Sequence, residues 1–113
     1  MNIDYKSRKL RKICEDPSNA QKEYGKQIGN KITQRVGELI AADCLDDISK
    51  IPAAELHSLE GTRSNQFAVT LVQPFRLVFS AVSEDKVSIT SLKEIKIIRI
   101  EEVVNYHGKQ KKK

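Results

Sequence analysis

The sequence predicts an α+β fold in which N-terminal helices pack on one face of a small antiparallel sheet. Apolar residues recur every three or four positions up to about residue 50, and they alternate with polar residues after Pro52. The helical part therefore precedes the strands, which is the order expected for this class. No repeat or linker composition interrupts the 113 residues. We expect one domain over 1–113, with a flexible basic tail at 109–113.

The first predicted helix is short, amphipathic and basic. Leu10, Ile13 and Cys14 recur at helical spacing after Ser7, a residue suited to cap the first turn. The remaining arc carries four cations: Arg8, Lys9, Arg11 and Lys12. These side chains either contact phosphates or form a solvated face, and the spacing leaves both alternatives open.

A second, longer helix is expected from about residue 17 to 42. Asp16 and Pro17 supply a cap and a first-turn proline, and apolar residues follow at steps of three and four. Three glycines lie inside it: Gly25, Gly29 and Gly37. Because glycine disfavours a helix interior, we expect close backbone packing or a local bend there. A third helical turn, over 45–48, should end before Pro52.

The rest of the chain predicts a run of antiparallel strands. Strands are expected over 55–60, 66–72, 75–82 and 94–104, with turns at 61–65 and 83–86 and an edge strand at 1–5. Phe75, Leu77 and Phe79 alternate onto one face, which the helices should cover. Arg76 lies between them and points to the other face.

The charge is uneven along the chain and favours a polyanionic partner. The net charge is +5, with nine Lys/Arg against four Asp/Glu in residues 1–36, one against six in 37–60, and ten against five in 61–113. Two basic flanks around an acidic middle suit nucleic acid on one side and a basic or neutral protein on another. A basic surface with no such partner remains the alternative.

The sequence shows no sign of membrane or metal chemistry. It has neither a secretory signal nor a stretch of roughly 20 apolar residues, so we expect a cytoplasmic protein. Cys14 and Cys44 lack metal-ligand spacing and are expected to be reduced thiols on helices. Phosphate-binding glycine loops, nucleophile elbows and carboxylate clusters are absent from the sequence. Asp46 and Asp47 fit an acidic surface or a cap. We therefore expect no metal and no cofactor.

Polar residues that suit RNA cleavage recur on the non-core face and ends of the predicted strands. They are His57, Arg63, Arg76, Tyr106 and His107. Cleavage without a metal requires removal of the ribose 2′-hydroxyl proton, stabilisation of charge on phosphorus, and protonation of the departing 5′ oxygen. Two histidines can exchange protons at neutral pH, and guanidiniums can stabilise the charge. Tyr106 is a poor base and better suited to stacking on a base or bonding a phosphate.

Each of these residues also has a structural explanation. A lone histidine on a strand is commonly half-exposed and inert, an arginine between apolar neighbours can extend over the sheet edge, and one in a turn is usually solvated. The terminal "KQKKK" would raise affinity for nucleic acid without specifying a sequence. Spacing alone thus leaves the function undecided.

The stretch "LHSLEGTRSNQFAVTLVQPFRLVFSAV", followed by a strand and "NYHG", resembles the plasmid maintenance killer protein family. This is the HigB-type branch of the RelE-like toxins of type II toxin–antitoxin systems. The motifs L-H-x-L-x-G, hydrophobic-x-x-P-[FY]-R-L-[IV]-F and Y-H occur in the family's order and at similar spacing. The resemblance covers almost the whole chain and is most specific over 55–108.

The resemblance implies a RelE-like fold and a toxin that cleaves mRNA on the ribosome without metal. It implies shared proton transfer by His57 and His107, substrate contact by Tyr106, and phosphate binding by Arg63 and Arg76. The implied partners are the ribosome and mRNA and a cognate helix-turn-helix antitoxin of the HigA type, through which alone the toxin would reach operator DNA.

Two positions depart from the family pattern and keep other functions open. Family members often carry Asp where this chain has Asn105, and Lys where it has Glu60. Either change could weaken cleavage. The alternatives are a catalytically weak or inactive homologue that acts as a binding module with its antitoxin in operon regulation, a basic RNA-binding protein, and an interaction protein whose acidic middle docks a basic partner.

Overall fold

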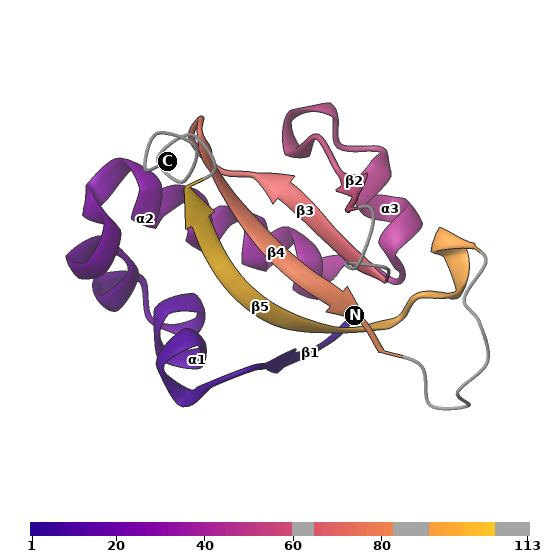
Figure 1. The fold of residues 1–113 in the computed structure, drawn as a ribbon, viewed down its shortest axis with the longest axis horizontal. Helices are drawn as coiled ribbons and strands as arrows, with labels where there is room; N and C mark the ends of the chain where they lie inside the picture. The colour runs from indigo at the N-terminus through magenta and orange to yellow at the C-terminus, as the bar shows by residue number, and fades with distance from the viewer. Residues whose placement is uncertain (60–64, 83–90, 106–113) are drawn as a thin grey trace, which may run out of the picture.

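The computed structural model describes residues 1–59, 65–82 and 91–105 (Figure 1). The elements in chain order are β1 (Asn2–Tyr5), α1 (Arg8–Glu15), α2 (Pro17–Ala41), α3 (Leu45–Ser49), the 3-10 helix η1 (Pro52–Ala54), β2 (His57–Ser58), β3 (Gln66–Thr70), β4 (Phe75–Ala81), the 3-10 helix η3 (Leu92–Glu94) and β5 (Ile97–Asn105). The predicted α+β class, with helices ahead of the strands, is confirmed. The expected turn at 83–86, most of that at 61–65 and the tail at 109–113 lie outside the described residues.

The strands described form one sheet of five in the order β1-β5-β4-β3-β2. Neighbours pair antiparallel except β1, which runs parallel to β5 from Asn2 opposite Ile97 to Tyr5 opposite Ile100. The expected edge strand is therefore present. Its parallel direction differs from the antiparallel run that the sequence predicts, because alternation reveals which face a residue occupies and not which way its neighbour runs.

The strand expected over 55–60 is much shorter in the structure. Pro52 opens η1, and Glu55 ends it with a left-handed backbone at φ 49° and ψ 51°. A residue in that conformation cannot belong to an extended strand, so pairing begins only at His57. One further bond, from Leu59 N to Gln66 O at 2.9 Å, continues it.

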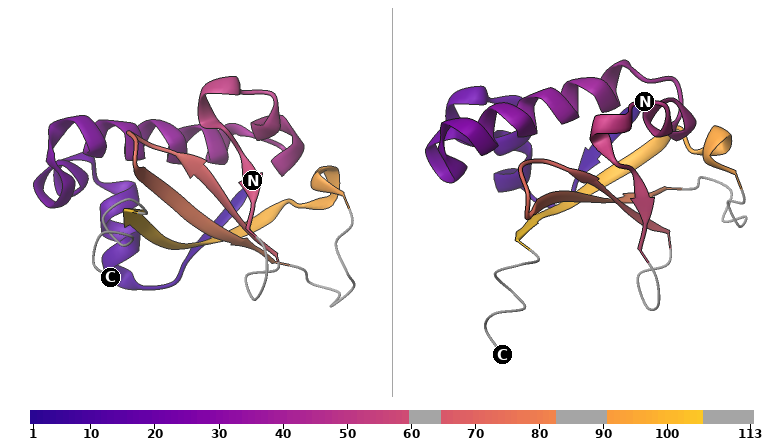
Figure 2. Two further views of the ribbon diagram at one scale, coloured as in Figure 1. Left: turned by 45° about the horizontal axis from the view of Figure 1, so that its top comes forward. Right: turned by 90° about the horizontal axis from the view of Figure 1, so that it is seen from above.

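Among the described residues, the helical layer covers one face of the sheet, and no helix covers the other face. In Figure 2, α2 and α3 lie over the same side, and α1 packs against α2 near the β1 edge. Phe79, Leu77 and Ile100 are fully buried under Ile32 and Leu39 of α2. The predicted inward face of β4 is thus confirmed. We call the opposite side the open face; its apolar centre is small and consists of Ala68, Val78 and Val104 with Leu59.

The long helix bends and packs closely at two of its three glycines. Gly25 has φ 87° and ψ 165°, which breaks the helical backbone and is a conformation that L side chains rarely adopt. A Cβ on Gly29 would lie 2.7 Å from the backbone of Gln21. Gly37 has nothing within 4 Å of the equivalent position. The expectation of a bend or close approach is therefore confirmed at Gly25 and Gly29 but not at Gly37.

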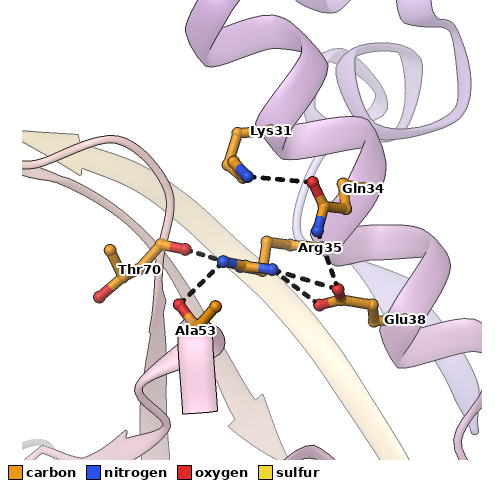
Figure 3. A network of polar contacts seen from close by, with 6 residues as sticks. All are labelled: Lys31, Gln34, Arg35, Glu38, Ala53 and Thr70. Carbon is orange, nitrogen blue, oxygen red and sulfur yellow. Dashed lines mark hydrogen bonds and ion pairs between the residues drawn. The ribbon is translucent and has the colours of Figure 1, made fainter. Parts of the chain in front are cut away.

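A buried arginine ties α2 to the sheet (Figure 3). Arg35 is 3% exposed; its Nε donates to Thr70 O at 2.8 Å and its Nη2 to Ala53 O at 2.8 Å. Its Nη1 donates to both carboxylate oxygens of Glu38, at 3.0 and 3.1 Å. A buried guanidinium is tolerated when its nitrogens meet oxygens, as all three do here. Arg35 therefore joins the helix to the end of β3 and to η1, directly ahead of His57.

Candidate functional site

Two of the predicted site residues, His57 and Arg76, meet on the open face. His57 pairs with Ala68 across β2 and β3, and Arg76 pairs with Thr70 across β3 and β4. Side chains of paired residues share a face, so this register brings the imidazole and the guanidinium to the same side. Arg76 Nη1 lies 2.7 Å from His57 Nε2, and both residues are half-buried. Neither side chain is enclosed among aliphatic residues or directed away from the other.

The other nitrogen of the imidazole also has a partner. His57 Nδ1 lies 3.1 Å from the carbonyl oxygen of Glu55, the residue with the left-handed backbone. The Glu55 carboxylate turns to β3, where Thr70 Oγ1 donates to it at 2.7 Å. Thr70 is 6% exposed and belongs to the same strand end that Arg35 holds from the helical side. Four residues, Glu55, His57, Thr70 and Arg76, thus form one continuous polar group at the β2–β4 end of the sheet, in which the backbone carbonyl of Glu55 links its carboxylate to the imidazole.

The remaining predicted catalytic residues fall outside the part of the chain that the structure describes. These are Arg63, Tyr106 and His107, and Glu60 lies there too. The described end of β5 nevertheless has a defined place. Val104 pairs with Arg76 and Asn105 pairs with Phe75, so β5 reaches its last described residue beside the Arg76 end of β4.

The four cations predicted on the first helix are exposed on α1, as expected. Ser7 caps that helix by accepting from Leu10 N at 3.1 Å. A hollow of about 390 Å³ beside it is lined by Tyr5, Lys6, Ser7, Arg8 and Arg11. α1 follows β1, and β1 and β2 are opposite edges of the sheet. α1 therefore lies near β1 and β5, whereas His57 lies on the opposite edge strand β2 and Arg76 on β4 between them.

Two protonatable groups near α1 are chemically quiet at neutral pH. Burial raises the pKa of the Cys14 thiol to about 12, and burial likewise raises the pKa of the Tyr5 phenol to about 12, although the Arg11 guanidinium partly opposes this rise. Neither group ionises readily, so neither is a nucleophile or a base. Both cysteines are free thiols, as predicted, but Cys44 lies at the N-cap of α3 and not within a helix.

A second polar cluster, which the sequence did not indicate, lies farther along the open face. The register of β4 and β5 slips after Val78, and this bulge turns Glu101 toward Ser80. Ser80 Oγ donates to Glu101 at 2.7 Å and Arg99 Nε donates at 2.9 Å. Burial raises the pKa of Glu101, but these two hydrogen bonds and the Arg99 charge outweigh it and hold the pKa below its usual value. Glu101 is therefore a carboxylate at neutral pH and no proton donor.

Arg35 and the Glu55–Thr70 contact were also missed. Arg35 carried a usable signal, because it is three residues after Ile32 and four before Leu39 and so falls on the apolar side of α2. Glu55 and Thr70 carried none, since their contact depends on a backbone conformation that no sequence period encodes. Among the described residues, no three His, Cys, Asp or Glu side chains gather as a metal site would require. None of the described helices is long and apolar enough to cross a membrane.

Comparison with known proteins gives similarities to solved structures only. No family model matches the sequence, and no curated protein matches it. Among solved structures, the chain is similar to a YoeB/ParE toxin from Agrobacterium tumefaciens, with 11% identity, a TM-score of 0.47, and coverage of 93% of this chain and 94% of that one. A likeness at this level transfers no residue role from that toxin to this chain.

Proposed function

We propose that this protein is the toxin of a type II toxin–antitoxin system, an endoribonuclease that cleaves mRNA on the ribosome without a metal and so inhibits translation. The observation that carries the proposal is the 2.7 Å contact between His57 and Arg76 on the open face. A proton-transfer group and a phosphate-binding cation are paired there, in a chain of net charge +5. The sequence resemblance to HigB-type toxins supports the same function.

The proposed reaction needs three groups at the scissile phosphate. One imidazole takes the 2′-hydroxyl proton, and the 2′ oxygen attacks phosphorus. The bond from phosphorus to the 5′ oxygen then breaks, and the second imidazole protonates that oxygen. Arg76 and Arg63 donate to the non-bridging oxygens, where negative charge develops. His57 and His107 are the proposed proton-transfer pair, and Tyr106 contacts the substrate. The products carry a 2′,3′-cyclic phosphate and a 5′-hydroxyl.

The proposed RNA partners rest on the charge distribution, and the proposed antitoxin rests on the resemblance to HigB-type toxins. Arg8, Lys9, Arg11 and Lys12 of α1 would contact phosphates of ribosomal RNA or mRNA at the β1 edge. A helix-turn-helix antitoxin of the HigA type would neutralise the toxin, and the complex would reach operator DNA only through the antitoxin.

A second candidate is a binding module that acts with its antitoxin and does not cleave. The observation that favours it is the same contact: Arg76 occupies the face of Nε2 that a base needs free. In a catalytic protein the guanidinium must turn to a phosphate when RNA binds. In a binding module it need not.

Paired induction in a growing bacterium separates the two candidates. Wild type, Arg76→Gln and His107→Ala are induced side by side, and growth and message ends are followed together. The control is Lys93→Gln, which removes one exposed positive charge from η3, away from the site. The nuclease predicts growth arrest and cyclic-phosphate ends with wild type and Lys93→Gln, and neither with the site variants. Normal growth with the wild type and with every variant would favour the binding module, if the wild type also forms a stable complex with the product of the neighbouring gene.

A further inference from the structure

We propose that Glu55 and Thr70 are positioning residues that fix the tautomer of His57, with the proton on Nδ1 and the lone pair of Nε2 directed at Arg76. The tautomer is a property of the folded chain alone. Its effect on cleavage rests on the nuclease proposed above.

The hydrogen-bonding chemistry of the two contacts determines the tautomer. A carbonyl oxygen only accepts and a guanidinium only donates, whereas a neutral imidazole has one nitrogen of each kind. The nitrogen at 3.1 Å from Glu55 O must therefore donate, and the nitrogen at 2.7 Å from Arg76 Nη1 must accept. An imidazolium has no lone pair and could not make the second contact. In this tautomer the acceptor nitrogen of His57 faces the guanidinium of Arg76.

The carbonyl that selects the tautomer is itself in an uncommon conformation. Glu55 has a left-handed backbone, which a residue with a side chain adopts only when its surroundings hold it there. Thr70, which is buried, constrains this conformation because its Oγ1 donates to the Glu55 carboxylate at 2.7 Å. Gln73 Nε2 lies farther away, at 3.5 Å from the same oxygen.

Arg35, in the core, fixes the segments on which Glu55 and Thr70 lie. Its guanidinium donates to the carbonyls of Thr70 and Ala53, on both sides of the Glu55 turn (Figure 3). The 3-10 helix before Glu55 and the strand end that carries Thr70 are therefore held by one buried side chain. Glu55 thus lies between two anchored segments, and its carbonyl keeps a constant direction toward His57 Nδ1.

The tautomer also indicates which histidine is the base and which is the acid in the proposed cleavage. A base must offer a lone pair, and Nε2 of His57 has one. His57 would then take the 2′-hydroxyl proton after Arg76 turns to the phosphate, and the role of acid would fall to His107.

Nitrogen-15 NMR on imidazole side chains tests the tautomer without any substrate. The chain has only two histidines, so protein labelled on histidine gives two ring systems, and His107→Gln assigns them. Spectra are recorded at pH 8, where an unperturbed imidazole, of pKa about 6.5, is neutral. Wild type should show a protonated Nδ1 and an unprotonated Nε2 for His57. A His57 ring with its proton on Nε2 in wild type would overturn the proposal.

Two substitutions at Thr70 separate positioning from packing. Thr70→Val keeps the branched shape but removes the hydroxyl, and Thr70→Ser keeps the hydroxyl but removes a methyl group. We expect His57 to become a mixture of tautomers in Thr70→Val and to stay on Nδ1 in Thr70→Ser. Glu55→Gln, which still offers an oxygen to Thr70, should resemble wild type. Unchanged spectra in Thr70→Val, with folding verified by circular dichroism, would contradict the role of Thr70.

Cleavage supplies the second readout. On ribosomes with a defined message, Thr70→Val should lower kcat by about tenfold or more with little change in KM. The separate variant Thr70→Ser should keep kcat near the wild-type value. Wild type that does not cleave but shows the predicted NMR pattern would reject the nuclease and leave the tautomer assignment standing. Active wild type with the opposite tautomer would reject the assignment alone.

Discussion

Arg35 and Arg76 approach Thr70 from opposite faces of the sheet and differ in what they contact. Arg35 is 3% exposed and donates to two backbone carbonyls, which do not titrate, and to a carboxylate. Arg76 is half-buried and lies against an imidazole, which can change its protonation. The same type of side chain thus links helix and sheet at Arg35 on the helical face and forms one half of the proposed reactive pair at Arg76 on the open face. Surroundings, and not residue type, separate the two roles.

The largest expected effect is on stability and comes from Arg35. Arg35→Met removes every hydrogen bond of the tie while keeping an unbranched side chain. We expect the free energy of unfolding to fall by about 3 kcal/mol or more, because the carbonyls of Thr70 and Ala53 and the Glu38 carboxylate all lose their donor. Urea denaturation measures this change. The matched variant Arg76→Met should change stability by less than about 1 kcal/mol. Equal losses in the two variants would remove the distinction between the faces.

The reverse pattern is expected for cleavage. Arg76→Lys keeps the charge but loses the planar pair of donors, and Arg76→Gln loses the charge as well. We expect kcat on ribosome-bound message to fall by about 10²-fold in Arg76→Gln, similar to the loss of one donor to a developing oxyanion. The control is Arg99→Gln, which changes another arginine of the sheet, one that is paired with Glu101. Its kcat should stay within a few-fold of wild type. A 10²-fold loss in Arg99→Gln would show that open-face charge in general drives cleavage.

Two glycines in α2 sharpen the comparison within the helical layer. Gly29→Ala would place a Cβ 2.7 Å from the Gln21 backbone, so we expect a loss of about 1–3 kcal/mol from overpacking. Gly37→Ala meets open space and should gain about 0.5–1 kcal/mol from helix propensity. Thermal unfolding of both variants measures the difference. A gain at Gly29 would mean that the two helical segments do not approach as closely as the structure places them.

Glu101 tests whether the open face also contributes to stability. Because its pKa is lowered in the folded protein, its contribution should be complete above the unfolded pKa of about 4.3 and lost as pH falls through the folded value. Glu101→Gln should therefore be about 1 kcal/mol less stable than wild type at pH 7, and the gap should narrow toward pH 3. A gap that does not depend on pH would assign the effect to packing instead of charge.

The sequence predicted the elements that depend on periodicity and on caps. Ser7 and Asp16 cap the first two helices where expected, and the inward face of β4 is as predicted. The alternation of β4 correctly placed Arg76 on the open face, where it meets His57 at 2.7 Å, although the strand that carries His57 is much shorter than predicted. The catalytic roles of all five site residues stay predictions.

Features set by single backbone conformations were not predictable. The left-handed Glu55 shortened one strand, and the bulge after Val78 brought Glu101 to the open face. The parallel direction of β1 depends on a partner near the other end of the chain. Neither local propensity nor spacing carries this information, because each feature depends on contacts between segments far apart in sequence.

The position of β5 has a consequence for biosynthesis. This strand lies between β1 and β4, contributes the fully buried Ile98 and Ile100, and follows every other helix and strand described. A nascent chain that lacks β5 has no strand for β1 to pair with, so the native five-stranded sheet cannot form until β5 has been synthesised. If the protein halts translation, each molecule becomes harmful to the cell only after its own β5 has joined the sheet.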